Sequence, residues 1–289
     1  MLVLFTDTDT DITLDEAKKY GYHLISMPYS IDGEIFYPYE SWTEFDAHEF
    51  YDKLRSGIVP KTSSISEEKY INYFEPFLKN GDDIFYIHFS RNMTTTFNAM
   101  DKAVEKLQEK YPERKIYTVD TNAITILSLN IVKEVGEMFK AGKTPEEVIE
   151  WVEKERGHFA LYFFSDSLKF FKHSGRVSNL TGTMGTMLGI RPIIYINDDG
   201  KMLSIGKEKG RFKATERLIR YVEELGEDLD QHRIIIGATD NEELVNEVKN
   251  LLVEKFGENL KIETHTINPT IGSHCGPDSV GICFYAKNR

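Results

Sequence analysis

The chain has 289 residues, of which 40% are hydrophobic and 12% aromatic, enough apolar material for one large domain or two ordinary ones. Its 35 basic and 47 acidic residues give a net charge of −12, which argues against nucleic acid or an anionic membrane surface as a partner. We find neither a signal-peptide pattern nor an apolar run of about 18 residues. With only two cysteines, Cys275 and Cys283, we expect a cytoplasmic protein without stable membrane insertion.

The first half of the chain alternates predicted strands with predicted helices. The apolar runs predict strands at residues 1–5, 22–31, 83–89 and 115–120. Helical periodicity and capping signals predict helices at residues 13–21, 41–57, 66–81, 96–111 and 122–142. Thr13 with Glu16, and Ser41 with Glu44, have the spacing of a capping box. This alternation predicts a Rossmann-like α/β domain, with a parallel sheet and helices on both of its faces.

The second half contains more strands and fewer helices. Extended runs occur at residues 159–164, 191–197, 201–208, 233–239, 261–267 and 281–286, and helices are predicted at 215–226 and 241–257. The sequence Asn-Asp-Asp-Gly at 197–200 predicts a hairpin turn. We therefore expect an α+β domain with a six-stranded, mostly antiparallel sheet at 158–289, joined to the first domain (1–157) by a helix at 144–157.

Two clusters of hydroxyl side chains precede predicted helices. Thr94, Thr95 and Thr96 follow the strand at 83–89, and the segment 62–66 contains four hydroxyl residues before the next helix. Hydroxyl groups at a helix N-terminus can cap the helix, and they can also donate hydrogen bonds to an anion. Either role fits these segments, but the carboxyl edge of a parallel sheet is where ligands usually bind.

A glycine-rich loop is predicted at residues 270–282, around His274. A histidine in such a loop can face a cavity or simply be solvated. Its neighbour Cys275 is a poor candidate for a catalytic pair, because adjacent side chains point apart on an extended chain. The eight histidines are scattered without ligand spacing, so we expect no metal site and no cofactor.

The N-terminal segment Thr-Asp-Thr-Asp-Thr-Asp offers the main enzymatic alternative. Two aspartates spaced by one residue after a strand are typical of a magnesium-dependent phosphotransferase or phosphatase, with Asp7 as nucleophile and Asp9 as acid and base. The residue two positions further is Asp11, where that pattern has threonine or valine. The segment 81–83 precedes a strand, so it is badly placed to supply a further metal carboxylate.

Eight motifs, in order along the chain, together resemble the DegV family of bacterial fatty-acid-binding proteins. They are TDTDTDI, PKTSSIS, FSRNMTTTFNAM, VDT, SGRVS, LGIRPII, GRFKA and GSHCGPDSVG. The resemblance covers almost the whole chain, so that residues 2–286 form one unit of this family. It implies two α/β-type domains with a long-chain fatty acid such as palmitate buried in a tunnel between them, and a binding protein rather than an enzyme.

The resemblance also implies the parts played by particular residues. Thr62 and Thr94 would hold the carboxylate, and the surrounding head-group network would contain Ser63, Thr95, Arg176 and His274. We expect the following apolar side chains to form the tunnel wall, although each could be ordinary core: Phe89, Met93, Phe97, Met187 and Leu188.

Some family members present their fatty acid to a separate kinase subunit. The resemblance therefore implies a fatty acid kinase catalytic subunit as a partner, with Arg211 and Lys213 as candidates for docking it. Several positions depart from the family pattern. Thr95 stands at a usual glycine, Asp9 adds an acid to the N-terminal motif, and Asp278 replaces a glycine in a loop expected to lie near the anion.

Overall fold

A four-stranded parallel sheet forms the centre of the N-terminal half in the computed structural model, which describes residues 1–178, 180 and 189–289. Its strand order is β2-β1-β6-β7, and Phe5 of β1 lies opposite Tyr86 of β6. The strands are β1 (Leu2–Asp7), β2 (Tyr22–Ile25), β6 (Asp83–His88) and β7 (Ile116–Asp120). All four therefore end at the same edge, as the predicted alternation requires.

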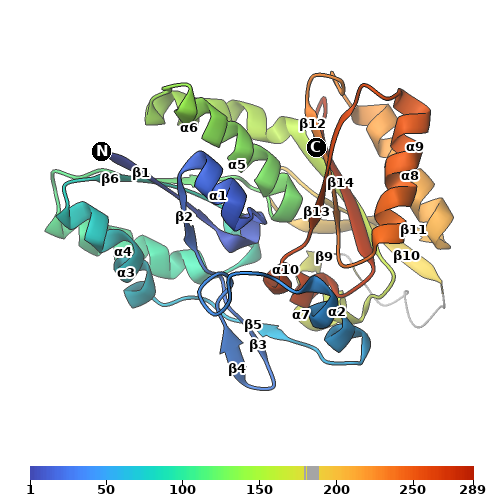
Figure 1. The fold of residues 1–289 in the computed structure, drawn as a ribbon, viewed down its shortest axis with the longest axis horizontal. Coiled ribbons are helices and arrows are strands. Elements are labelled where there is room, and N and C mark those ends of the chain that lie inside the picture. The colour runs from blue at the N-terminus through green and yellow to red at the C-terminus, as the bar shows by residue number, and fades with distance from the viewer. Residues whose placement is uncertain (179, 181–188) are drawn as a thin grey trace.

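Helices lie on both faces of this sheet (Figure 1). They are α1 (Leu14–Tyr20), α3 (Glu67–Lys79), α4 (Thr96–Lys110), α5 (Thr125–Lys140) and α6 (Pro145–Glu155). The predicted capping box is present at α1, where Thr13 accepts a hydrogen bond from the Glu16 amide. Gly21 ends the helix in a left-handed conformation, with φ of 78°.

A small antiparallel sheet, which was not expected, and helix α2, which was, project from the N-terminal half. The predicted strand at 22–31 is in fact two strands, because Pro28, which has no amide hydrogen, separates β2 from β3. The predicted helix at 41–57 begins only after Asp46, whose side chain accepts from the Glu49 amide. The elements are β3 (Tyr29–Ile31), β4 (Glu34–Phe36), β5 (Lys61–Thr62) and α2 (Ala47–Arg55).

A mixed sheet forms the C-terminal half, in the order β13-β12-β14-β8-β10-β11-β9 within the described residues. All six predicted strands are present, and the two-residue strand β9 is an addition. The pairs β12–β13 and β9–β11 are parallel, and the other pairs are antiparallel. The strands are β8 (Phe159–Ser165), β9 (Val177–Ser178), β10 (Ile190–Ile196), β11 (Met202–Lys209), β12 (Arg233–Ala238), β13 (Lys261–Thr266) and β14 (Ser279–Tyr285).

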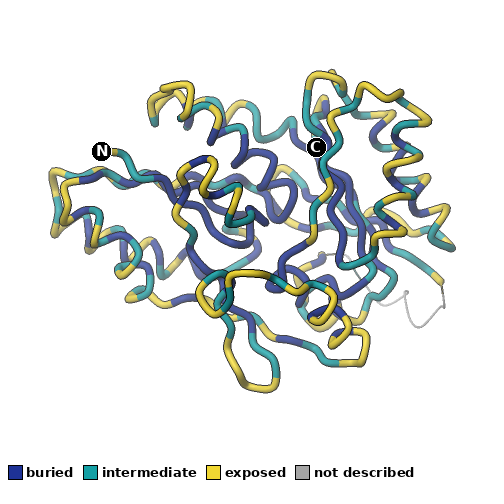
Figure 2. The backbone as a smooth tube through the Cα atoms, in the orientation of Figure 1, coloured by how far each residue is buried: buried dark blue, intermediate teal, exposed yellow. Residues whose placement is uncertain are grey.

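The mixed sheet is buried on both faces, as strand β8 illustrates. Ala160, Tyr162 and Phe164 pack in the cluster that contains α8 (Arg211–Leu225) and α9 (Glu242–Phe256). Leu161 belongs to the other large cluster, which includes α5 and the parallel sheet. Successive strand residues point to opposite faces, so one face of β8 meets two helices and the other meets the N-terminal half. The central strands and α5 are accordingly dark blue in Figure 2.

Several short helices connect these elements: η1 (Thr8–Thr10), η2 (Arg91–Met93), η3 (Arg156–His158), α7 (Lys169–Ser174) and α10 (Pro269–Cys275). The last of these corrects the loop predicted at 270–282. Asn268 caps α10 by accepting from the amides of Thr270 and Ile271, and Pro269 occupies the first helical position, where its missing amide hydrogen costs nothing.

Polar contacts join the two halves around the predicted hairpin turn. The Ser90 hydroxyl donates to the Gly200 carbonyl at 2.9 Å, and the Asn122 side chain donates to the Asp198 carbonyl at 3.0 Å. Gly200 has a φ of 72°, and a Cβ added there would overlap Ser90. The turn therefore needs glycine both for its backbone angle and for its close approach to the other half.

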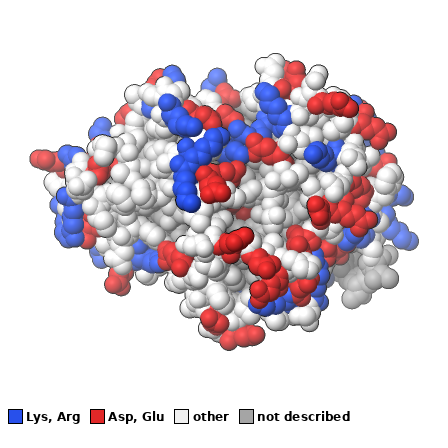
Figure 3. Space-filling view, in the orientation of Figure 1, with Lys and Arg blue, Asp and Glu red and all other residues white. Residues whose placement is uncertain are grey.

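The surface carries charge of both signs. On the face shown in Figure 3, most basic residues lie beside acidic ones. One such contact is largely buried, where Lys133 of α5 pairs with Glu16 at 2.8 Å and with Glu263 of β13. Among the described residues, no helix is both long enough and apolar enough to span a membrane.

Candidate ligand-binding cavity

A cavity of about 730 Å³ lies between the two large sheets. This volume is within the range of about 300–1,000 Å³ that is typical of small-molecule sites. Its walls come from the carboxyl edge of the parallel sheet, from β5, α5 and α10, and from the inner face of the mixed sheet. The site therefore lies where the topology of an α/β sheet is expected to place one.

Thr62 and His274 meet on the wall of this cavity. The Thr62 hydroxyl lies 3.0 Å from Nε2 of His274, and the two residues are 212 positions apart in the sequence. Burial lowers the pKa of His274 to about 4, assisted by the positive charge of Arg176. The ring is therefore neutral at pH 7, and its buried Nδ1 has no hydrogen-bond partner among the described residues.

The three consecutive threonines have different environments. Thr94 lies on the cavity wall, and its hydroxyl accepts from the Thr96 amide at 3.1 Å at the start of α4. The Thr96 hydroxyl is buried and accepts from the Ile65 amide, while Thr95 pairs with Ser64 at 3.2 Å. These contacts place the segment after Thr62 beside the threonine segment, so hydroxyl groups from two distant parts of the chain gather on one wall.

The other residues predicted for the head-group network lie where the cavity meets solvent. Ser63 and Arg176 line the cavity and are exposed, and Arg176 donates to the Ser174 carbonyl. The predicted docking residues are elsewhere, because neither Arg211 nor Lys213 lines the cavity. Arg211 forms an ion pair with Asp166 at 2.6 Å, whereas Lys213 is exposed on α8.

Two of the residues predicted for the tunnel wall, Phe89 and Met93, line the cavity. Phe97 does not, because it is buried behind them in the core, with its ring 5.0 Å from that of Phe89. Met187 and Leu188 lie outside the described residues.

Most of the apolar wall was missed from the sequence. It comprises Met27, Ile124, Ile126, Leu161, Phe163, Phe171, Ile196, Met202, Ile267, Ile271 and Val280. The alternation along the predicted strands could have identified Leu161 and Phe163 as residues sharing one face. It could not show that this face borders a cavity instead of another packed element.

Three buried aspartates follow strand β1. Burial raises the pKa of Asp7 to about 7, and its oxygens accept from the Tyr86 hydroxyl and from the amides of Phe89 and Asp9. Burial also raises the pKa of Asp11, which accepts from Thr125 and from the side chain and backbone of Asn268. Thr125 has a φ of 54°, a strained angle for a β-branched residue, at the point where α5 begins.

Asp9 is the member of this group that reaches the cavity. It is 6% exposed and lines the wall, whereas Asp7 is fully buried and does not. A phosphotransferase would need Asp7 to contact substrate, so this geometry does not support Asp7 as a nucleophile. Burial, followed by the charges of Asp7 and Asp11, raises the pKa of Asp9 well above its ordinary value. Burial at this position therefore favours the neutral acid more than solvent does.

Two further groups near the cavity have structural roles. Burial raises the pKa of the Cys275 thiol to about 12, so it stays protonated and is a poor nucleophile. Asp278 does not line the cavity. It takes a left-handed φ of 58°, and it pairs with Arg55 at 3.3 Å and with Asn241 at 2.8 Å. The Asp278 charge is therefore engaged in these contacts outside the cavity wall.

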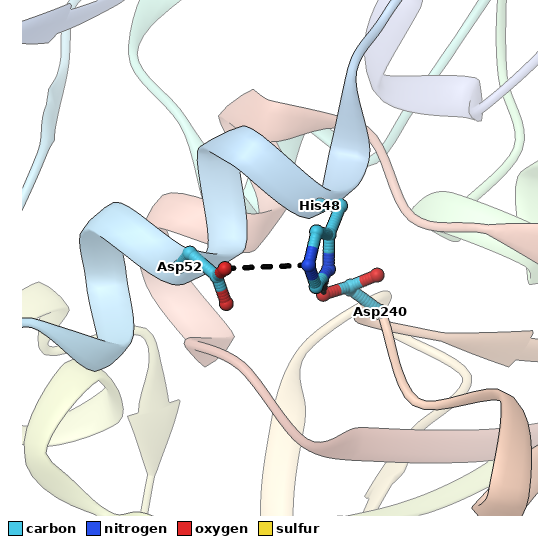
Figure 4. Close-up of side chains that lie close together, drawn as sticks. All are labelled: His48, Asp52 and Asp240. Carbon is cyan, nitrogen blue, oxygen red and sulfur yellow. Dashed lines mark hydrogen bonds and ion pairs between the residues drawn. The ribbon is translucent and has the colours of Figure 1, made fainter.

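One group of side chains has the spacing of metal ligands, although the sequence suggested none. Nε2 of His48 lies 3.4 Å from Oδ2 of Asp52, and its Nδ1 lies 3.2 Å from Oδ2 of Asp240. Figure 4 shows the three side chains close together. The group is at the surface and does not line the cavity. The Arg55 guanidinium already contacts Asp52 at 2.8 Å and Asp240 at 2.7 Å. We therefore interpret it as an ion-pair bridge between α2 and the C-terminal half.

The fold and the cavity define an α/β protein with a largely apolar cavity between a parallel sheet and a mixed sheet. Residues 1–287 match the family model described as "Uncharacterised protein, DegV family". A DegV domain-containing protein of Clostridium perfringens is 31% identical over 287 residues, which cover 99% of this chain and 98% of that protein. The chain belongs to the DegV family.

Solved structures share this fold. A stearic acid-binding protein from Eubacterium ventriosum has a TM-score of 0.87 and 20% identity, with 99% of both chains covered. A DegV family protein from Thermus thermophilus, described by its fatty acid binding, has a TM-score of 0.84 and 22% identity, also with 99% of both chains covered. The α/β fold, with one parallel and one mixed sheet, is therefore that of known DegV structures.

Proposed function

We propose that this protein binds a long-chain fatty acid in the cavity between its two sheets. The carboxylate lies at Thr62 and Thr94, and the acyl chain follows the apolar wall. The observation that carries this proposal is the gathering of hydroxyl groups from two segments on a wall that is otherwise largely apolar. Further support comes from similar folds described as bound to stearic, heptadecanoic or vaccenic acid.

The acyl chain supplies most of the binding free energy. At roughly 0.8 kcal/mol for each buried methylene, about 14 methylenes contribute on the order of 11 kcal/mol before the costs of association. A hydrogen bond to a charged acceptor adds roughly 1.5–3 kcal/mol. Neutral hydroxyl groups also avoid the desolvation cost of burying a cation beside the carboxylate. The hydroxyl groups therefore fix the orientation of the ligand, and the wall determines its affinity.

His274 orients the Thr62 hydroxyl in this arrangement. The neutral ring donates from Nε2 to the Thr62 oxygen, and the Thr62 hydrogen is then free to donate to the ligand carboxylate. The lowered pKa favours this arrangement, because the ring needs no charge to donate.

We further propose a carrier role and not catalysis. The residues at the carboxylate site are hydroxyl groups and a neutral histidine, with the exposed Arg176 nearby, and the neighbouring thiol is protonated. The family resemblance implies that a separate kinase receives the fatty acid. Exposed Ser63 and Arg176 lie where the cavity meets solvent, which favours this opening over the ion-paired Arg211 as the place where such a partner acts.

Removing the hydroxyl groups tests the carboxylate site. Thr62→Val and Thr94→Val should each weaken fatty-acid binding by about tenfold, because each loses a hydrogen bond to a charged acceptor. The measurement is displacement of a fluorescent fatty acid from delipidated protein, together with organic extraction and mass spectrometry of the protein as purified. Thr118→Val is the matched control, since Thr118 is exposed on β7 and does not line the cavity. Unchanged affinity in both cavity variants, or an extract without any fatty acid, would contradict the proposal.

A second pair of variants tests the part played by His274. His274→Leu should weaken binding several-fold but still copurify with fatty acid, because the Thr62 hydroxyl remains. His274→Gln should restore part of the affinity, since its amide can donate to the same oxygen. The fatty-acid affinities of both variants are measured by titration under identical conditions. Complete loss of ligand from a folded His274→Leu protein would instead make His274 a direct carboxylate ligand.

A further inference from the structure

Asp9 places an unpaired carboxyl group on the wall of the cavity. The residue is only 6% exposed, and its Oδ1 atom is fully enclosed without a hydrogen-bond partner among the described residues. An unpaired buried polar group of this kind is costly, and native structures contain few of them. The only other such side-chain atom in the described residues is Nδ1 of His274. Asp9 therefore adds a polar group to the cavity wall besides those at Thr62 and His274.

Two hydroxyl groups on the same wall donate to other acceptors and not to Asp9. Thr125 donates to Asp11, and Thr270 donates to the Met27 carbonyl at 2.8 Å. Within the described residues, the backbone amide of Asp9 donates to Asp7, and its carboxyl group has no hydrogen-bond partner. Because Oδ1 is enclosed, a group on the ligand would reach the carboxyl group through Oδ2.

Asp9 is separated from the carboxylate site along helix α10. It belongs to η1, whose Thr8 carbonyl accepts from the Asn268 side chain at 3.0 Å, immediately before α10 begins. His274 lies six residues further along, which corresponds to about 9 Å at 1.5 Å per residue. The charges that act on Asp9 are those of Asp7 and Asp11, not those beside His274. An acyl chain anchored at Thr62 would therefore pass Asp9 several carbons from its carboxylate.

A neutral carboxyl group has an O–H donor and a carbonyl acceptor. Methylene groups satisfy neither, and a ketone can only accept, so it pairs only when the accessible oxygen carries the proton. A hydroxyl group both donates and accepts, so it can pair with that oxygen whether or not it carries the proton. A site whose polar groups are paired only by the correct ligand discriminates against the analogue that lacks the polar group.

We propose that the cavity selects fatty acids that carry a hydroxyl group several carbons from the carboxylate, with Asp9 as the partner of that hydroxyl. The inference rests on the proposed function, because it takes a fatty acid as the ligand.

Paired ligands that differ by one oxygen test this selection. Delipidated full-length protein is titrated with stearic acid and with hydroxystearic acids substituted at carbon 2 and at successive mid-chain positions. At least one mid-chain hydroxy acid should bind about tenfold more tightly than stearic acid, and the 2-hydroxy acid should show no such gain. Asp9→Leu should abolish the preference and bind stearic acid at least as tightly as the wild type. Asp9→Asn, which keeps a donor and an acceptor, should retain the preference.

The outcomes separate this inference from the proposed function. If the wild type binds every hydroxy acid no better than stearic acid, the inference is overturned, whether or not the variants fold. A preference that persists in a folded Asp9→Leu protein overturns it as well. If neither stearic acid nor any hydroxy acid binds to the wild type, the proposed function itself fails. Thermal unfolding of each variant without ligand establishes that the proteins compared are folded.

Discussion

Leu161→Trp is expected to reduce fatty-acid binding at least 100-fold. Leu161 is 2% exposed on β8 and lines the cavity, so a larger side chain there can extend into the space that the acyl chain would occupy. The chain supplies on the order of 11 kcal/mol of gross binding free energy, and losing about 2.7 kcal/mol already lowers affinity 100-fold. The cavity gives the indole ring room, so we expect the free energy of unfolding to fall by no more than about 1–3 kcal/mol.

Leu161→Met is the matched control, because it nearly conserves volume and should keep the affinity of the wild type. Displacement titrations measure binding, and urea unfolding without ligand measures stability. A Leu161→Trp protein that binds stearic acid as tightly as Leu161→Met would show that the acyl chain does not pass this part of β8.

The second large effect concerns stability and pH. Burial raises the pKa of Asp7 from 3.8 to about 7, so ionisation is harder in the folded protein than in the unfolded chain. The resulting stabilisation is complete at low pH and is lost as the pH rises toward 7. For Asp7 alone, the free energy of unfolding should fall by about 2–3 kcal/mol between pH 5 and pH 8.

Asp7→Asn should remove most of this fall, because the amide cannot ionise. It should also lower the pKa of Asp9, because the charge of Asp7 is one of the causes that raise it. Urea unfolding of both proteins at pH 5 and pH 8 gives the difference that belongs to Asp7. Asp15→Asn is the control, since the Asp15 side chain is 96% exposed. Equal changes with pH in the wild type and Asp7→Asn would mean that Asp7 is ionised in the folded state at pH 5.

Histidines produce the opposite trend at lower pH. Burial lowers the pKa of both His88 and His274 to about 4, so stability is lost as the pH falls from about 6.5 toward 4. The comparison of Asp7→Asn with the wild type cancels this contribution, because both proteins keep the two histidines.

The N-terminal architecture was predictable because its signals are local. The Thr13 capping box and the terminal Gly21 act within a single helix, and both are present. Alternating strands and helices predict a parallel sheet because a parallel crossover needs a connecting helix. The helix predicted at 41–57 begins later than expected because Asp46, and not Ser41, caps it. The strand predicted at 22–31 is divided because Pro28 interrupts the extended run.

The sequence alone therefore determined the order of the elements, the family resemblance and the hydroxyl segments, because each depends on neighbouring residues. Only the tertiary structure brought Thr62 to His274 across 212 positions, and only it showed that Phe97 is core while Leu161 is wall. It likewise showed that Asp9 is buried on the cavity wall, with an Oδ1 atom that has no partner in the described part of the chain. The physical reason is that a cavity forms where two faces, from distant parts of the chain, do not fill the space between them. The periodicity within either segment cannot indicate that space.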